Sequence, residues 1–235
     1  MGIMQIPRYP SEPCLLITDS GLASLVLTAM ASEQPTTADQ LRSVLYPAWW
    51  ISQSDMDIRI PAVDKAVEMQ ADLLSLSVIR DRAGYPEEAS DRGHQSSLGV
   101  HQTRMLLDAA ALAIELGIKR VVWPIHVQES GDSAQQLTQI ATAIDRALLT
   151  ARLATLDAQD HGGVEVTIET PLVDLTTQQL SDLAADLNIP IRSCWWSDDS
   201  LPDAQAEHAL WTNQPTTAGM LEHRPSSASE PALGT

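Results

Sequence analysis

Residues 14–31 read CLLITDSGLASLVLTAMA, and this stretch decides the fold. The apolar run 14–18 is typical of a buried strand, and the small residues that follow it predict a tight turn over 19–24. Apolar residues at helical spacing predict a helix over 22–30. A carboxylate, Asp19, stands at the head of the turn.

Strand and helix patterns alternate along the rest of the chain. The expected strands are 14–18, 41–50 (ending at Pro47), 77–80, 121–125 and 164–168, and the expected helices are 22–30, 61–74, 105–116, 137–151 and the stretch after Thr176. This order predicts an α/β fold with a mainly parallel five-stranded sheet and right-handed crossovers. Residues 81–100 are expected to form a long loop. Ligands bind at the carboxyl ends of such strands, so the turn at 19–24 is the first candidate site.

Helix ends carry their own signals. Pro61 suits the first turn of the helix over 61–74. Ser133 with Gln136, and Thr176 with Gln179, each match a capping box. An apolar stripe is expected to bury one face of the helix between these boxes: Leu137, Ile140, Ala141, Ile144, Ala147, Leu148 and Ala151. After the second box the inner face is Leu180, Leu183, Ala184 and Leu187, and Asn188 and Pro190 end the helix.

Composition limits the function classes. The 235 residues carry a formal net charge of -17, with 14 Lys and Arg against 31 Asp and Glu, which argues against nucleic acid as a partner. No apolar run has the length of a membrane span, and no signal peptide is recognised, so a cytoplasmic protein with no membrane partner is expected. One domain over 1–213 and a disordered tail over 214–235 are predicted. The two cysteines, Cys14 and Cys194, form no disulfide framework.

The turn DSGLAS has features of an anion site. Small residues let backbone N–H groups approach a phosphate, the helix that follows adds its positive dipole, and Ser20 and Ser24 carry hydroxyl donors. The alternative is that Asp19, Ser20 or Ser24 simply caps the helix.

The turn resembles the SGGxDS pyrophosphate loop of the PP-loop ATP pyrophosphatases. Residues 168–196, IETPLVDLTTQQLSDLAADLNIPIRSCWW, resemble the segment of the 7-cyano-7-deazaguanine synthase family in which a strand, "PL-D-T", a helix and an "SC-aromatic" run lead into a zinc site. Residues 105–125 are similar to that family's buried helix and following strand. The resemblance covers most of 14–196.

This resemblance implies an adenine-nucleotide-binding, Rossmann-like PP-loop fold. It also implies ATP with Mg on the loop, and ATP-dependent, C–N bond-forming ligase chemistry that makes a nitrile in queuosine biosynthesis. The nucleotide-binding loop would comprise Asp19, Ser20, Gly21, Leu22 and Ser24.

The sequence departs from the family at its functional positions. Asp19 and Ser20 replace the loop's first Ser and Gly, and Ala23 replaces its Asp, whereas Gly21 and Ser24 are kept. Three further substitutions fall outside the loop: His101 and Gln102 stand for an Arg-Asn pair, and Thr177 for a Lys. Cys194 is the lone remnant of a four-cysteine zinc site, so zinc is not expected.

Other candidate residues have ordinary structural readings beside the functional ones. His101, near the predicted loop, and His126, after a predicted strand, are candidate pocket residues. A replacement metal set of Cys194, His208 and His223 fits no known spacing. The tryptophans Trp195, Trp196 and Trp211 either stack a ligand or pack in the core. The acidic residues Asp198, Asp199 and Asp203 either form a solvated loop or bind a cation.

Three hypotheses follow. The favoured one is a degenerate 7-cyano-7-deazaguanine synthase-like protein, a pseudoenzyme without the standard activity that still binds a nucleotide or purine-like ligand or serves as a partner subunit. The second is an active ATP-dependent ligase or amidotransferase with a rewired site, using Ser20, Ser24, His101 or His126. The third is a non-enzymatic interaction protein. The sequence leaves the catalytic residues and the oligomeric state unassigned.

Overall fold

The computed structural model describes residues 12–33, 42–48, 56–80, 98–129, 131–159, 163–197 and 204–212. Five strands form one sheet in the order β3-β2-β1-β4-β5, and every pair is parallel. The strands are β1 (Leu15–Thr18), β2 (Val44–Pro47), β3 (Ser77–Val78), β4 (Arg120–Val122) and β5 (Thr167–Glu169). The predicted five-stranded parallel α/β fold is confirmed.

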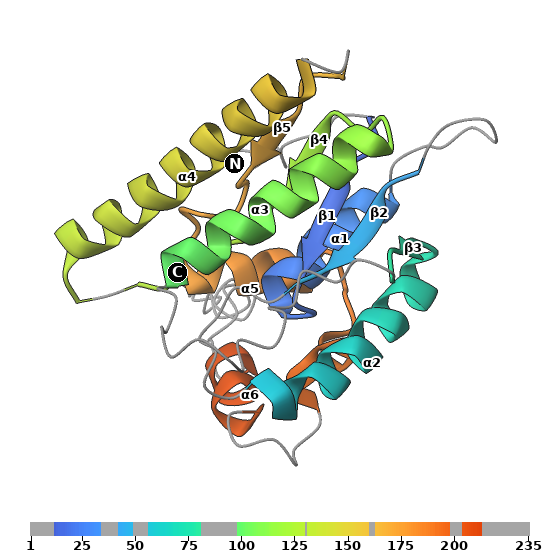
Figure 1. Cartoon of the computed structure of the whole chain (residues 1–235). Coiled ribbons are helices and arrows are strands. Elements are labelled where there is room, and N and C mark those ends of the chain that lie inside the picture. The colour runs from blue at the N-terminus through green and yellow to red at the C-terminus, as the bar shows by residue number, and fades with distance from the viewer. Residues whose placement is uncertain are drawn as a thin grey trace, which may run out of the picture.

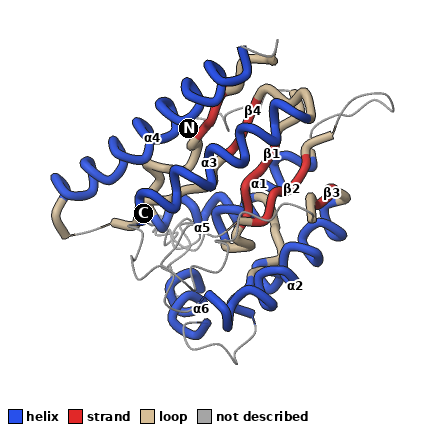
Figure 2. The backbone as a smooth tube through the Cα atoms, viewed as in Figure 1, coloured by secondary structure: helices blue, strands red, loops and turns tan. Residues whose placement is uncertain are grey.

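Helices cover both faces of the sheet, as Figures 1 and 2 show. Leu16 of β1 packs with α1 (Leu22–Ser32), α2 (Met56–Leu74) and α5 (Thr177–Asp186). Its neighbours Leu15 and Ile17 point the other way and pack with α3 (Leu98–Glu115) and α4 (Ser133–Gln159). Successive side chains of a strand point to opposite faces, so a strand buried on both sides must be apolar throughout, as the run 14–18 is.

The centre of the sheet is a topological switch point. From β1 the chain goes through α1 to β2 on one side, and only later returns to place β4 on the other side. Ligand sites of parallel sheets lie outside the strand ends at such a point. The turn after β1 therefore occupies the position that the sequence singled out.

Two helices begin earlier than predicted. Helix α2 starts at Met56, so Pro61 lies inside it and not in its first turn. The backbone tolerates this at the loss of one helical hydrogen bond. Helix α3 starts at Leu98, so residues 98–100 are helical and not part of a loop. The remainder of the predicted loop, 81–97, lies outside the described residues.

The other end of α3 agrees with the prediction. Met105, Leu106, Ala109 and Ala113 are buried, and Gly117 takes a left-handed backbone with φ 69° just past the helix. That conformation favours glycine and ends a helix.

Strand β4 ends earlier than expected, at Val122, although the N–H of Trp123 still donates to the carbonyl of Glu169 (2.8 Å). Strand β5 begins later than expected, at Thr167, and the N–H of Val166 donates to Thr155 Oγ1 of α4 (3.3 Å).

Helix α4 differs from its prediction in cap and in face. Asp132 Oδ1 accepts hydrogen bonds from the N–H groups of Ala134 (2.9 Å) and Gln135 (3.3 Å), so Asp132 is the N-cap and the Ser133 capping box is wrong. The buried face consists of Ala143, Ala147, Thr150, Ala151, Ala154 and Thr155. Leu137 and Leu148 of the predicted stripe are 67% and 60% exposed.

The start of α5 matches its prediction in full. Thr176 Oγ1 accepts from the N–H of Gln179 (3.0 Å), and Gln179 Oε1 accepts from the N–H of Thr176 (2.8 Å). Two short 3-10 helices, η2 (Ile191–Ser193) and η3 (Trp195–Ser197), and then α6 (Ala204–Thr212) follow. The predicted tail over 214–235 lies outside the described residues. No helix among the described residues has the length and apolarity to cross a membrane.

Candidate functional site

The turn between β1 and α1 keeps the backbone of a tight glycine turn. Ser20 has φ 56°, a left-handed conformation that glycine adopts freely and serine rarely does. Gly21 is the N-cap of α1 and has no side-chain cap. Asp19, Ser20, Gly21, Leu22 and Ser24 are all buried, and Ala23 is half-buried. The structure therefore brings the five predicted loop residues together beneath the surface.

The side chain of Asp19 occupies the turn that it begins. Its Oδ1 accepts hydrogen bonds from the N–H of Gly21 (2.8 Å) and from Ser24 Oγ (2.5 Å). Ser24 Oγ accepts in turn from the N–H of Asp19 (3.3 Å). A Cβ on Gly21 would lie 3.0 Å from Asp19 Oδ1, so the carboxylate lies directly against the glycine. A backbone donor and a hydroxyl donor of the turn thus already bind a carboxyl oxygen that belongs to the chain itself.

The electrostatics of Asp19 favour its protonated form. Burial raises the pKa of its carboxyl above the usual value, against the hydrogen bonds from Ser24 and Gly21, which lower it. The carboxylate of Glu207 on α6 raises the pKa further. The groups that set the ionisation of Asp19 thus include a second acid but no lysine or arginine.

Residues 191–197 cover the turn. The N–H of Trp195 donates to the carbonyl of Ser20 (3.3 Å). Gln70 Nε2, from α2, donates to the carbonyl oxygens of Ser20 (3.1 Å) and Ser193 (3.0 Å). Three buried atoms here, Ser20 Oγ, Gln70 Oε1 and Ser193 Oγ, have no hydrogen-bond partner among the described residues. The turn is therefore held in a polar interior by two segments distant in sequence.

Cys194 lies in the same interior. It is a free, buried cysteine, and burial raises the pKa of its thiol well above the usual value, with Asp19 and Glu207 acting in the same direction. A neutral thiol is a poor metal ligand. No group of three or more His, Cys, Asp or Glu side chains within the described ranges could hold a metal ion.

The tryptophans next to Cys194 pack in the core. Trp195 and Trp196 are buried, and their rings meet edge to face at 5.9 Å between centroids. Trp211 on α6 is also buried, and its Nε1 donates to Glu207 Oε2 (3.0 Å). Of the two readings of these residues, packing is the one observed. The acidic residues 198, 199 and 203 and His223 lie outside the described part of the chain.

The two candidate histidines have structural surroundings. His101 is buried on the inner side of α3 and not in a loop. His126 follows β4; its Nε2 lies 3.0 Å from the carbonyl oxygen of Leu175, and its ring centroid is 5.7 Å from that of Trp211. Because a carbonyl oxygen can only accept, Nε2 donates this hydrogen bond. Burial lowers the pKa of the His126 ring.

Helix α6 joins parts of the site that sequence reasoning had left apart. His126 contacts Trp211, Trp211 binds Glu207, and Glu207 acts electrostatically on Asp19 and Cys194. Glu207 was not among the candidates. Its spacing of four residues from Trp211 on one helix was the available signal.

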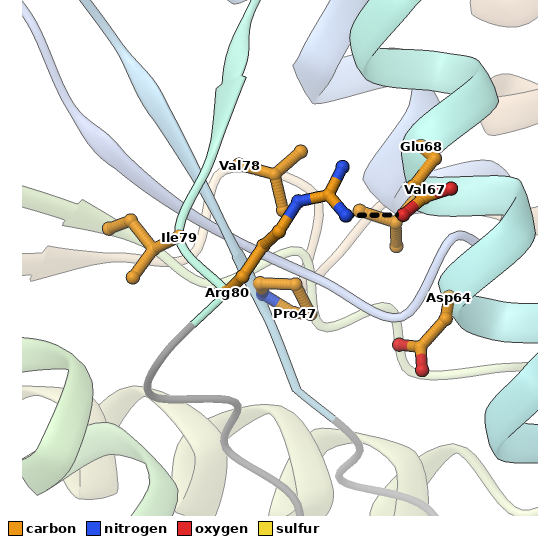
Figure 3. Close-up of a pocket in the computed structure, with 7 residues that line it drawn as sticks. All are labelled: Pro47, Asp64, Val67, Glu68, Val78, Ile79 and Arg80. Atoms are coloured by element: carbon orange, nitrogen blue, oxygen red, sulfur yellow. Dashed lines mark ion pairs between the residues drawn. The ribbon is translucent and has the colours of Figure 1, made fainter.

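Two hollows lie near this region. The first has a volume of about 210 Å³ and is lined by Pro47, Asp64, Val67, Glu68, Val78, Ile79 and Arg80. Arg80 and Glu68 form an ion pair of 2.7 Å in this hollow (Figure 3). Because Glu68 neutralises Arg80 and Asp64 adds a negative charge, this hollow is unsuited to an anion. The other, of about 430 Å³, lies between α2 and residues 192–197, and its lining includes Lys65, Arg192 and Trp195.

Comparison with known proteins gives little more. No family model matches the chain, and no curated protein matches it. Among solved structures, the U34-tRNA thiolase of Methanococcus maripaludis with its 4Fe-4S cluster aligns with 92% of this chain and 75% of its own, at 14% identity and a TM-score of 0.45. A likeness this slight carries no argument about function.

Proposed function

We propose that this chain is a degenerate PP-loop protein, related to the 7-cyano-7-deazaguanine synthases, that lacks the standard ATP-dependent nitrile-forming activity. The observation that carries the proposal is the contact of the Asp19 carboxylate with the Gly21 N–H and the Ser24 hydroxyl. These are donors that a pyrophosphate would need. In this chain they bind an internal acid.

In its ionised form, Asp19 would work against a nucleotide by charge as well. A phosphate oxyanion about 4 Å from an ionised Asp19 would be repelled by roughly 4 kcal/mol at an effective dielectric of 20. That is about a thousandfold in affinity. Protonation of Asp19 would remove the repulsion, but its oxygen would still occupy the two donors.

The positions that supply positive charge in the resembled family hold no lysine or arginine here. Gln102 is neutral, and His101 lies buried on the inner side of α3. Thr177 begins α5 as a buried residue in the position of the family's lysine. Phosphoryl and adenylyl transfer depend on cations that stabilise the developing charge, so these substitutions support loss of activity.

The test is an assay of the purified protein with 7-carboxy-7-deazaguanine, ammonium and MgATP. Nitrile product is measured by mass spectrometry, and AMP and pyrophosphate are measured in parallel. The proposal expects none of these products, while an active synthase under the same conditions supplies the positive control. Nitrile formation that Ser24→Ala abolishes would overturn the proposal and favour the rewired enzyme.

A second candidate function, binding of a purine-like anion, is favoured by the larger hollow. Lys65 is one of only two lysines in a chain of net charge -17, and it lines this hollow together with Arg192 and Trp195. Two cations at the edge of one hollow suit an anionic ligand. Titration with AMP should give saturable binding that Lys65→Ala and Arg192→Ala each weaken. No binding, or binding that neither substitution changes, would reject this candidate.

A further inference from the structure

Helix α4 carries large apolar side chains on its solvent side. Six of them are exposed: Leu137 (67%), Ile144 (38%), Leu148 (60%), Leu149 (71%), Leu153 (46%) and Leu156 (45%). Figure 1 shows α4 along the outer side of the molecule, next to α3 and β5. A group of exposed apolar residues along one helix is a common mark of a protein interface.

The residues that α4 buries explain why these leucines are left outside. The inner face is made of alanines, Ala143, Ala147, Ala151 and Ala154, which allow close packing on the domain. Arg146 adds an attachment to α3, because its Nη1 donates to the carbonyl of Gly99 (3.0 Å) and to Gln102 Oε1 (2.6 Å). Repacking α4 to bury the leucines would break these contacts, so the outer face needs another cover.

The outer face also carries two opposite charges in register. Asp145 and Arg152 are both exposed and stand seven residues apart, which is two turns on one line of the helix. Leu148 and Leu149 lie between them. In an antiparallel copy of the helix, Arg152 takes the position of Asp145 and Asp145 that of Arg152. Leu148 and Leu149 exchange positions in the same way. The face is therefore complementary to its own antiparallel copy.

We propose that the partner of this face is a second copy of the chain, with the two α4 helices antiparallel about a two-fold axis between Leu148 and Leu149. This arrangement places Asp145 opposite Arg152 of the partner subunit. Leu148 then meets Leu148 of the partner subunit, and Leu149 meets Leu149 of the partner subunit. By the two-fold symmetry, each dimer contains two Asp–Arg pairs around a central group of four leucine side chains.

The exposed area is of the right order for a dimer. The six side chains expose roughly 600 Å² per subunit, while a standard interface buries about 800 Å² per partner. The paired Asp145 and Arg152, with polar residues beside them such as Thr138, supply the remainder. A self-matching charge pattern favours a second copy over an unrelated partner, because it requires no complementary sequence from elsewhere.

The first experiment measures the mass of the full chain in solution by analytical ultracentrifugation at about 0.15 M salt, where long-range repulsion between two acidic chains is screened. The expected species has twice the 25.5 kDa of one chain. Leu148→Glu with Leu149→Glu should give monomers with an unchanged circular-dichroism spectrum. A wild-type monomer at roughly 50 μM, that is, a dimer weaker than about -6 kcal/mol, would overturn the proposal.

Charge reversal then tests the register. Asp145→Arg and Arg152→Asp should each weaken the dimer at least about tenfold, because one substitution creates two like-charge pairs per dimer. An equimolar mixture of the two single variants should form a heterodimer, and the double variant should regain wild-type affinity. Asp186→Arg, an exposed charge reversal on α5, is the matched control and should change nothing. A dimer insensitive to both single reversals would refute the antiparallel α4 interface.

Discussion

Ser20 is the residue at which the strain of the altered turn can be measured. It holds a left-handed backbone with φ 56°, and its hydroxyl is fully buried with no partner among the described residues. Ser20→Gly relieves roughly 1–2 kcal/mol of backbone strain. It also removes the burial cost of the hydroxyl, about 1 kcal/mol. Glycine has more conformational freedom in the unfolded chain, and this reduces the gain in stability by about 0.5–1 kcal/mol.

The net expectation is a stabilisation of about 1–2 kcal/mol, which for a domain of this size raises Tm by roughly 3–6 °C. Thermal unfolding followed by circular dichroism measures it. Two variants separate the contributions. Ser20→Ala removes only the hydroxyl, and Ser75→Gly, at an exposed serine with the same φ of 56°, relieves only the backbone. A Ser20→Gly protein that melts at or below the wild-type temperature would refute the reasoning.

Three further predictions concern charges and caps. The pKa of the Asp19 carboxyl is raised in the folded protein. The protonated carboxyl therefore stabilises the fold fully at a pH below the pKa of Asp19 in the unfolded chain, and this stabilisation is lost as the pH rises through the pKa in the folded protein. Asp19→Asn keeps the accepting oxygen Oδ1 but cannot ionise, so in thermal melts the variant should be more stable than wild type at pH 7 and equal to wild type near pH 4. A difference in Tm that stays constant with pH would contradict this. Asp132→Ala should cost about 1 kcal/mol in urea unfolding, and Ser133→Ala less than about 0.5, because Asp132 is the true cap of α4. Glu169→Gln should lower the free energy of unfolding in urea by about 2 kcal/mol, because it weakens two hydrogen bonds from the buried Arg120 guanidinium. An unchanged free energy of unfolding would mean that solvent replaces Glu169.

The central strand β1 was predictable because it is buried on both faces and must be apolar throughout. The run 14–18 could be nothing else, and the stop at Pro47 and the capping box at Thr176 follow from local chemistry. Helix α4 was misjudged for a tertiary reason. Its sequence offers both an alanine face and a leucine face, and only packing against α3 and β5 selects the smaller side chains for burial.

The sequence predicted where the candidate site lies but not how its side chains are arranged. The carboxyl end of β1 follows from the order of the elements. The direction of the Asp19 side chain, the cover supplied by residues 191–197 and the approach of Glu207 depend on segments up to about 190 residues apart in the chain, which no local pattern encodes. His101 was expected near a loop because the start of α3 is too polar to read as a buried helix.

The most direct test of the central claim, that Asp19 occupies the anion site of the turn, is calorimetric titration with MgATP. It compares wild type with Asp19→Ser/Ser20→Gly, a variant that frees the Gly21 N–H and the Ser24 hydroxyl and restores the glycine. Up to millimolar ATP, we expect no binding to wild type that Ser24→Ala weakens, and we expect binding to the variant that Ser24→Ala weakens. Saturable binding to wild type that Ser24→Ala weakens would contradict the account.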